Sequence, residues 1–261
     1  GMTEKAFGGQ TRVAIVTGGF AGIGLSAAAE LARQGVSVAV GARTVVDASL
    51  SQLAELSSPV WGGELDVRDT ESVRSFVLEV ERQLGSVDIL VNSAGIGTQQ
   101  TVSEHDEQKW LDVIDTNLNG CFRMIKACMP GMIERKWGRI VSVGSTAART
   151  AVPKYAAYCA STSGLLGLNR AVALEGATHG VTATVVSPTW VQTEMMNKSF
   201  QAKAKEQGTS FEEEIDALVR QVPQQRLVQP SEIGALIAFL CREEAAGITM
   251  EDIQVNAAAW W

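Results

Sequence analysis

Short apolar runs alternate with longer amphipathic segments along almost all of this 261-residue sequence. The runs are rich in valine and isoleucine, and several are continuously apolar instead of alternating with polar residues. That pattern is typical of strands buried on both faces of a parallel sheet. It predicts strands at residues 13–16, 36–40, 87–91, 139–143 and 181–187, with weaker ones at 60–65 and 253–256.

The segments between these runs carry a helical repeat of apolar positions. Helices are predicted at residues 22–34, 70–84, 107–135, 155–179 and 231–241. Strands that alternate with helices favour right-handed crossovers and a parallel sheet. We therefore expect an α/β fold, a single domain over residues 1–261 with a Rossmann-like doubly wound parallel sheet of about seven strands and helices on both faces.

One stretch, at about 189–229, departs from this rhythm because it is polar and charged and follows a predicted strand without a clean crossover. Ligands of such sheets bind beyond the carboxyl ends of the strands. An insertion at this point is placed to cover a substrate. The alternative is a surface helical hairpin without a role.

Composition narrows the possible functions. The net charge of −7 argues against non-specific binding to nucleic acid or to an anionic membrane. The four cysteines have no paired spacing and the chain has only two histidines, so we expect no metal site. Unpaired cysteines also predict a reducing, cytoplasmic setting. The sequence has no apolar run of the length that spans a bilayer.

A glycine-rich turn follows the first predicted strand, in the sequence "RVAIVTGGFAGIG". Gly18, Gly22 and Gly24 stand between the strand and a helix. Glycines there permit a tight turn and a close approach of backbone to a pyrophosphate at the helix N-terminus. The spacing predicts a dinucleotide site.

The end of the second strand bears on which dinucleotide binds. A carboxylate there would bind the adenosine ribose hydroxyls, whereas a guanidinium suits a 2′-phosphate. Gly41 and Ala42 offer no acid, and Arg43 follows them. The prediction is NADP(H), with NAD(H) as the less favoured choice.

Several motifs occur together in a fixed order. They are "TGGFAGIG" (17–24), "LDV" (65–67), "NSAG" (92–95), Asn117 in "TNLNG", Ser145 in "VSVGS", Tyr158 thirteen residues later, and "SPTWVQT" (187–193). In this order the chain resembles the short-chain dehydrogenase/reductase family over about residues 12–256. Within that family it most resembles bacterial NADPH-dependent ketoreductases of acyl-thioester or polyketide carbonyls.

The resemblance implies roles for individual residues. Tyr158 would be the acid, Ser145 would steady the carbonyl oxygen, and Asn117 would hold the water and backbone arrangement that links the site to solvent. Thr162 completes the candidate catalytic group. The implied cofactor-binding residues are Thr17, Gly18, Phe20, Gly22, Ile23, Gly24, Arg43, Asp66, Val67, Asn92, Ala94, Gly95, Tyr158, Pro188, Val191 and Thr193.

Thr162 is the main departure from the family pattern, which has a lysine one helical turn after the tyrosine. That lysine binds the nicotinamide ribose and favours the phenolate. Without a cation, forming a phenolate from a phenol of pKa near 10 costs about 4 kcal/mol at neutral pH. The loss should therefore impair alcohol oxidation more than carbonyl reduction. Lys154 could replace the missing charge, but it is expected to lie in the loop before the helix.

Two smaller departures accompany it. Phe20 stands where the family often has a phosphate-binding serine, and Ala257 and Ala258 stand where it has paired glycines. The neighbouring C-terminal segment commonly lies near a subunit interface in the family, and Trp260 and Trp261 offer apolar anchors there.

The sequence thus predicts an NADP(H)-dependent oxidoreductase that reduces a ketone or 3-oxoacyl-type carbonyl to a secondary alcohol, weakened by Thr162. The alternative is a catalytically silent dinucleotide-binding protein that acts as a sensor or subunit. The resemblance implies a small-molecule carbonyl substrate, a homo-oligomer (dimer or tetramer), and neither nucleic-acid nor membrane partners.

Overall fold

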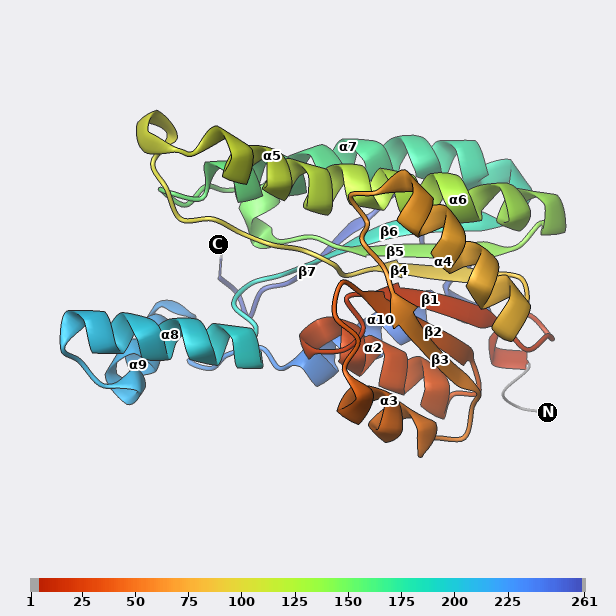
Figure 1. Ribbon diagram of the computed structural model, residues 1–261, viewed down its shortest axis with the longest axis horizontal. Coiled ribbons are helices and arrows are strands. Elements are labelled where there is room, and N and C mark those ends of the chain that lie inside the picture. Colours follow the sequence, from red (N-terminus) through yellow and green to blue (C-terminus); the bar gives the residue numbers. More distant parts are fainter. Residues whose placement is uncertain (1–4, 260–261) are drawn as a thin grey trace.

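A seven-stranded parallel sheet forms the centre of the computed structural model, which describes residues 5–259 (Figure 1). The strand order is β3-β2-β1-β4-β5-β6-β7, so the order reverses between β1 and β4, where such sheets bind ligands. The strands are β1 (Val13–Thr17), β2 (Ser37–Ala42), β3 (Val60–Glu64), β4 (Ile89–Asn92), β5 (Gly138–Val143), β6 (Val181–Pro188) and β7 (Asp252–Val255). The predicted fold class is confirmed.

Helices cover both faces of the sheet in two layers (Figure 1). One apolar core joins the sheet to α2, α3 and α10, and a second joins it to α4, α6 and α7. The helices are α2 (Gly22–Arg33), α3 (Asp47–Ala54), α4 (Thr70–Gln83), α5 (Glu107–Ile114), α6 (Gly120–Arg135), α7 (Ala156–Gly176), α8 (Glu194–Gln207), α9 (Phe211–Gln221) and α10 (Pro230–Leu240). Continuous burial of β1 and β4 explains why each is apolar up to its last residue.

The helix predicted at 107–135 is confirmed in its bounds, but its hydrogen-bond pattern changes in the middle. A π-helical turn at Asp115–Asn119 separates α5 from α6. The wider turn inserts a residue into the helical repeat and buries Asn117. Such turns occur frequently at functional sites. The short helix α3 was not predicted.

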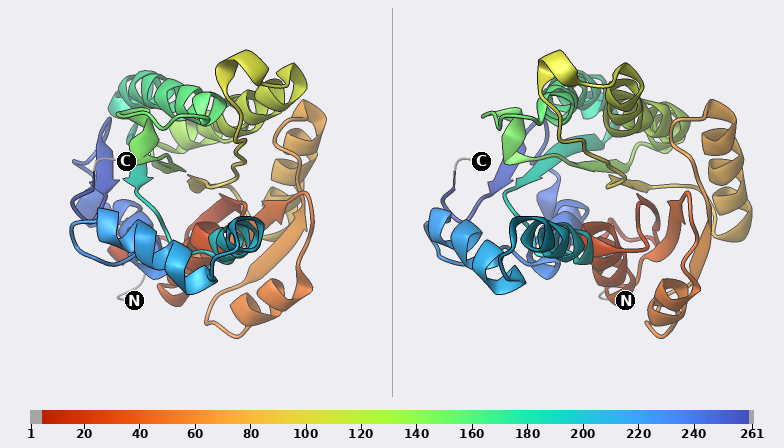
Figure 2. Two further views of the ribbon diagram at one scale, coloured as in Figure 1. Left: turned by 90° about the vertical axis from the view of Figure 1, so that its left-hand side faces the viewer. Right: turned by 60° about the vertical axis from the view of Figure 1, so that its left-hand side comes forward.

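The stretch 189–229 forms α8 and α9, which pack side by side beyond the carboxyl end of β6 (Figures 1 and 2). Met196, Leu218 and Leu227 form a small core of their own there. The base of the stretch is tied by backbone bonds from Gln192 N to Val228 O at 2.8 Å and from Val228 N to Trp190 O at 3.2 Å. The segment is therefore a packed unit attached next to the carboxyl edge of the sheet.

Among residues 5–259, no helix combines the length and apolar character needed to cross a bilayer. The same residues contain no cluster of three or more histidine, cysteine, aspartate or glutamate side chains that could hold a metal ion. The proposed anchors Trp260 and Trp261 lie outside the described residues. Ala257 and Ala258 adopt φ angles of 48° and 70°, the left-handed conformation that favours glycine.

Candidate active site

The glycine turn between β1 and α2 is shaped to admit backbone-bound anions. Gly18 has φ +64°, and a Cβ added there would lie 3.0 Å from the carbonyl oxygen of Ser93. A Cβ at Gly24 would lie 2.4 Å from the carbonyl oxygen of Gly18. Helix α2 begins without a side-chain cap at Ala21 and without an acidic residue in its first turn. Its free amides and positive dipole end therefore fit a dinucleotide pyrophosphate.

Hydrogen bonds join the ends of β1 and β4 beside this turn. The Thr17 hydroxyl oxygen accepts from Ser93 N at 3.1 Å and from Ala94 N at 3.2 Å. Ser93 in turn donates to Thr17 O at 2.7 Å, and the buried Asn92 amide donates to the Ser142 hydroxyl at 3.1 Å. The sheet edge under the glycine turn is thereby fixed. Gly95 follows directly and faces Asn117, while Ile23 is partly buried in α2.

The side chain of Phe20 does not face the phosphate site, where a serine of the family would bind. The ring is buried in the core on the α2 side of the sheet, and its carbonyl oxygen accepts from the Ser49 hydroxyl at 2.7 Å. Any contribution of Phe20 to phosphate binding would come from its backbone.

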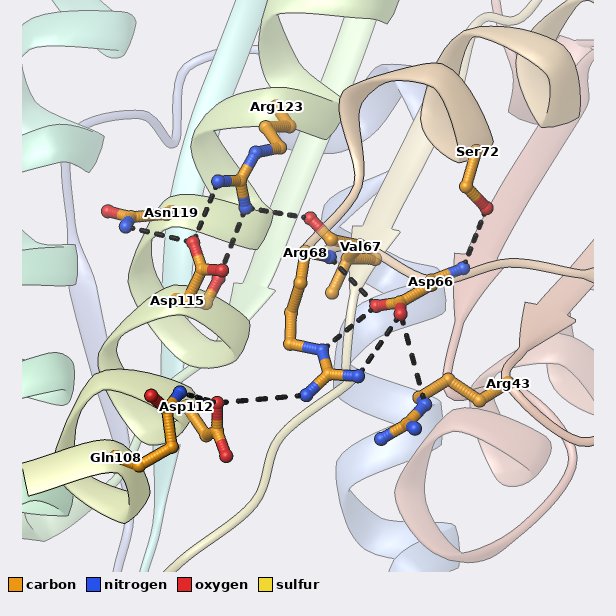
Figure 3. A network of polar contacts seen from close by, with 10 residues as sticks. All are labelled: Arg43, Asp66, Val67, Arg68, Ser72, Gln108, Asp112, Asp115, Asn119 and Arg123. Atoms are coloured by element: carbon orange, nitrogen blue, oxygen red, sulfur yellow. Dashed lines mark hydrogen bonds and ion pairs between the residues drawn. The ribbon is translucent and has the colours of Figure 1, made fainter.

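At the adenosine end, Asp66 is held by an arginine that sequence reasoning missed (Figure 3). Arg68 donates to the two carboxylate oxygens of Asp66 at 3.1 Å and 3.2 Å, and the Arg43 Nε lies 4.0 Å from the same carboxylate. The hydrogen bond from Arg68 lowers the pKa of Asp66. The adjacent Val67 is buried, and its carbonyl oxygen accepts from Arg123. The sequence gives no sign of this role, because an arginine at position 68 has the character of an ordinary solvent-exposed residue.

Tyr158 and Ser145 come together at the carboxyl edge of the sheet. Tyr158 lies in the first turn of α7, and Ser145 caps a short 3₁₀ turn after β5, where its Oγ accepts from Ala147 N at 3.1 Å. Burial raises the pKa of Tyr158, and a side-chain hydrogen bond with Ser145 partly opposes that rise. Tyr158 is therefore a neutral phenol at physiological pH, paired with an aliphatic hydroxyl.

Asn117 stands behind this pair and joins three segments. Its Oδ1 accepts from Ile96 N at 2.9 Å, and its Nδ2 donates to Ile96 O at 2.8 Å and to Ser161 Oγ at 3.2 Å. The side chain thus ties the loop after β4 to α7. Its amide is committed to these structural bonds.

Thr162 is buried and bonds to its own helix. Its hydroxyl donates to the carbonyl oxygens of Tyr158 at 3.0 Å and Cys159 at 3.2 Å. Lys154 lies in the loop before α7 with φ +73°, and its carbonyl oxygen accepts from Gln100 N at 2.9 Å. The predicted loop position of Lys154 is confirmed.

A cavity of about 200 Å³ opens over the Tyr158–Ser145 pair. Its walls are mainly apolar and include Trp190 of the 189–229 segment and Tyr155, whose hydroxyl accepts from Gln99. The lining residues are Gly97, Ser145, Thr146, Ala147, Val152, Tyr155, Tyr158, Thr189 and Trp190. Tyr155 was missed; it is the N-cap residue of α7, and its only sequence signal is its place three residues before Tyr158.

The segment after β6 reaches back to the glycine turn. Thr193 caps α8 by accepting from Met196 N at 3.1 Å, and a Cβ added to Gly22 would lie 3.4 Å from the Thr193 methyl group. Pro188 ends β6 and Val191 is buried. The segment after β6 therefore runs from the cavity wall, at Thr189 and Trp190, to the glycine turn.

The structure combines a glycine turn at the switch point of a parallel sheet with a phenol and a hydroxyl in the wall of an apolar cavity. This combination is that of a Rossmann-like oxidoreductase. The chain belongs to the short chain dehydrogenase family, whose model matches residues 12–204.

Relatives match nearly the full length. Over 249 residues the chain is 39% identical to a Streptomyces virginiae protein named as a putative ketoacyl reductase of the monensin polyketide synthase, covering 94% of this chain and 95% of the relative. It is 35% identical to the 3-oxoacyl-acyl-carrier-protein reductase FabG of Vibrio cholerae, covering 95% and 97%. The crystal structure of a variant of actinorhodin polyketide ketoreductase with NADPH is 36% identical and superimposes with a TM-score of 0.91, covering 95% and 96%.

Proposed function

We propose that the protein uses NADP(H) to reduce a ketone or 3-oxoacyl-type carbonyl to a secondary alcohol, with turnover weakened by Thr162. The observation that carries this proposal is that Tyr158 and Ser145 lie together in the wall of one apolar cavity. The relatives named as ketoacyl and 3-oxoacyl reductases, and the ketoreductase structure that contains NADPH, support the same reaction.

The chain's own residues would act on the carbonyl oxygen. When bound, the nicotinamide supplies the hydride. Tyr158 then gives its proton to the developing alkoxide, and Ser145 stabilises the negative charge by a hydrogen bond. Asn117 holds the loop after β4 and α7 in register, which keeps Tyr158 at a constant position. The apolar walls of the cavity would limit the access of water to this step.

The cofactor would lie along the carboxyl edge of the sheet. Residues Thr17 to Gly24 would bind the pyrophosphate, Arg43 the 2′-phosphate, and Asp66 and Val67 the adenine. Asn92, Ala94 and Gly95 would support the ribose nearest the nicotinamide. Pro188, Val191 and Thr193 would hold the carboxamide and select the hydride face.

The segment 189–229 would act as the cover of the substrate site, because Trp190 lines the cavity and packs against Phe200 of α8. We also propose a cytoplasmic homo-oligomer, a dimer or tetramer. Three exposed apolar side chains on the same layer of helices support it: Leu111 on α5, Phe122 on α6 and Leu174 on α7. Helix α6 continues the line of α5, and α7 runs beside them (Figure 1).

The test is NADPH oxidation with a panel of ketones and 3-oxoacyl thioesters. Turnover that is lost in Tyr158→Phe would support the proposal. Stabilisation by NADPH with no turnover on any member of the panel, and turnover gained in Thr162→Lys, would instead identify a silent dinucleotide-binding protein.

A further inference from the structure

Asp66 and Arg43 stand in an unfavourable arrangement for a cofactor that carries a 2′-phosphate. The Asp66 carboxylate is 31% exposed and lies 4.0 Å from the Arg43 Nε. A phosphate bound by Arg43 would therefore share one guanidinium with a carboxylate. Because a phosphate monoester carries about −1.5 to −2 charges at neutral pH, the two anions would repel each other.

Arg68 relieves this conflict. Its Nε and Nη2 bind the two oxygens of the Asp66 carboxylate, and its backbone N–H donates to Oδ1 at 3.0 Å. Three charge-assisted or backbone bonds thus converge on one carboxylate, which is the arrangement that holds an aspartate ionised and compensated. The charge of Asp66 is therefore compensated by Arg68 and does not depend on Arg43.

The position of Arg68 is itself fixed from a second element. Its Nη1 lies 3.9 Å from the carboxylate of Asp112 on α5, and Figure 3 shows its guanidinium between Asp66 and Asp112. The Arg68 side chain is 24% exposed, whereas that of Arg43 is 68% exposed. In Figure 3 the terminal nitrogens of Arg43 point away from Asp66. The fork of Arg43 is therefore available to a ligand.

We propose that Arg68 is a specificity-determining residue that selects NADP(H) over NAD(H) by neutralising Asp66, so that Arg43 can bind the 2′-phosphate. The proposal rests on the proposed NADP(H) dependence. It assigns to Arg68 an electrostatic action through Asp66 and no contact with the phosphate.

A double-mutant cycle tests this mechanism through ligand dissociation constants, without a measurement of catalytic activity. Calorimetric titration of the full-length protein would give the Kd of NADPH, NADH, 2′,5′-ADP and 5′-AMP for the wild type, Arg68→Gln, Asp66→Asn and the double variant. We expect Arg68→Gln to weaken NADPH and 2′,5′-ADP by about three- to tenfold, the scale of a partly screened charge pair. NADH and 5′-AMP should change little.

The decisive comparison is made with asparagine at position 66. There the repulsive charge is absent, so Arg68→Gln should no longer change the ratio of the NADPH and NADH dissociation constants. Arg74→Gln removes an exposed arginine of α4 that pairs with Glu71, and should leave all four ligands unaffected. Melting temperatures without ligand would identify any variant that fails to fold.

Two results would overturn the role of Arg68 and leave the NADP(H) dependence intact. One is an equal weakening of NADPH and NADH by Arg68→Gln. The other is a loss of NADPH preference that persists with Asn at position 66, which would mean that Arg68 binds the phosphate directly. A wild type that binds NADH as tightly as NADPH would refute the cofactor choice itself, and this inference with it.

Discussion

The hydroxyl of Thr162 donates to the main-chain carbonyl of Tyr158, one helical turn earlier, at 3.0 Å. Thr162 therefore points its proton at the helix backbone and leaves the phenol of Tyr158 without support from this position. In the part of the chain that the structure describes, the pKa of Tyr158 is shifted by burial, by Ser145 and by Cys159, and none of these is a cation. The result is an acid that holds its proton firmly.

A lysine at position 162 should restore activity unequally in the two directions. Burial places the pKa of Tyr158 above 10.0, so the wild type has the neutral acid needed for reduction and almost no phenolate for oxidation at neutral pH. In Thr162→Lys the added charge lowers that pKa. We expect alcohol oxidation to rise by about tenfold for each pKa unit, and carbonyl reduction by less.

The measurement is the rate of both directions as a function of pH. Wild-type oxidation should keep rising with pH beyond the ordinary tyrosine range, and in Thr162→Lys the rise should move to lower pH. Thr162→Met is the matched control, because it adds length without charge. Equal gains in both directions would contradict the explanation.

Removal of the phenol should separate chemistry from cofactor binding. Tyr158→Phe deletes the acid and should lower kcat by about 10²- to 10⁴-fold, while the Kd of NADPH stays nearly constant. Ser145→Ala should lower kcat by about 10²- to 10³-fold. It should also raise the pKa of Tyr158 further, because the Ser145 hydrogen bond is what lowers it. Steady-state kinetics with calorimetric titration checks both; retained turnover in Tyr158→Phe would exclude Tyr158 as the acid.

The strands and the glycine turn could be predicted because their causes are local. Residues 13–16 are all apolar because both faces of β1 are buried. Position 18 favours glycine because its φ is positive and a Cβ there would lie 3.0 Å from the carbonyl oxygen of Ser93. The order of the motifs also placed Ser145 and Tyr158 at one edge, since parallel strands end on the same side.

Other features depend on tertiary contacts that leave no local pattern. The π turn at Asp115–Asn119 has the composition of an ordinary helix, and Asn117 is buried there by its bonds to Ile96. Arg68 gains its role only because Asp66 and Asp112 lie on either side of it. The helix α3 is short and carries only two buried residues, so its hydrophobic repeat is weak.

Trp190 should set the size of the substrate that fits. It lines the cavity, and its ring meets that of Phe200 edge-on, with centroids 6.1 Å apart. Trp190→Ala should shift kcat/KM toward bulkier ketones by about tenfold, since it removes a large apolar wall. Phe200→Ala should produce the same shift in weaker form, because it loosens Trp190.

A panel of ketones of increasing size measures this shift as a ratio of kcat/KM values. Phe239→Ala is the control, because Phe239 is exposed on α10 and does not line the cavity. An unchanged ratio in Trp190→Ala would place the substrate elsewhere.

Glu232 should stabilise the protein in a pH-dependent way at the end of the 189–229 segment. Its carboxylate accepts two bonds of 2.8 Å from Arg226 and one of 2.7 Å from Gln229 N, at the start of α10. The Arg226 bond, followed by the Gln229 bond, lowers the pKa of Glu232 to about 2 from an ordinary value of 4.5. Because the folded pKa is the lower one, this stabilisation is present above about pH 4.5 and is lost as the pH falls toward about 2.

We therefore expect Glu232→Gln to reduce the free energy of unfolding at neutral pH by about 1 kcal/mol, a value kept small because both side chains are about a third or more exposed. The melting temperature should fall by about 2–4 °C. Urea denaturation at a series of pH values should show the difference from the wild type shrinking as the solution becomes acidic. Glu206→Gln, an exposed change on α8, should show no such trend. A difference that stays constant down to acidic pH would mean that Glu232 acts through packing and not through its charge.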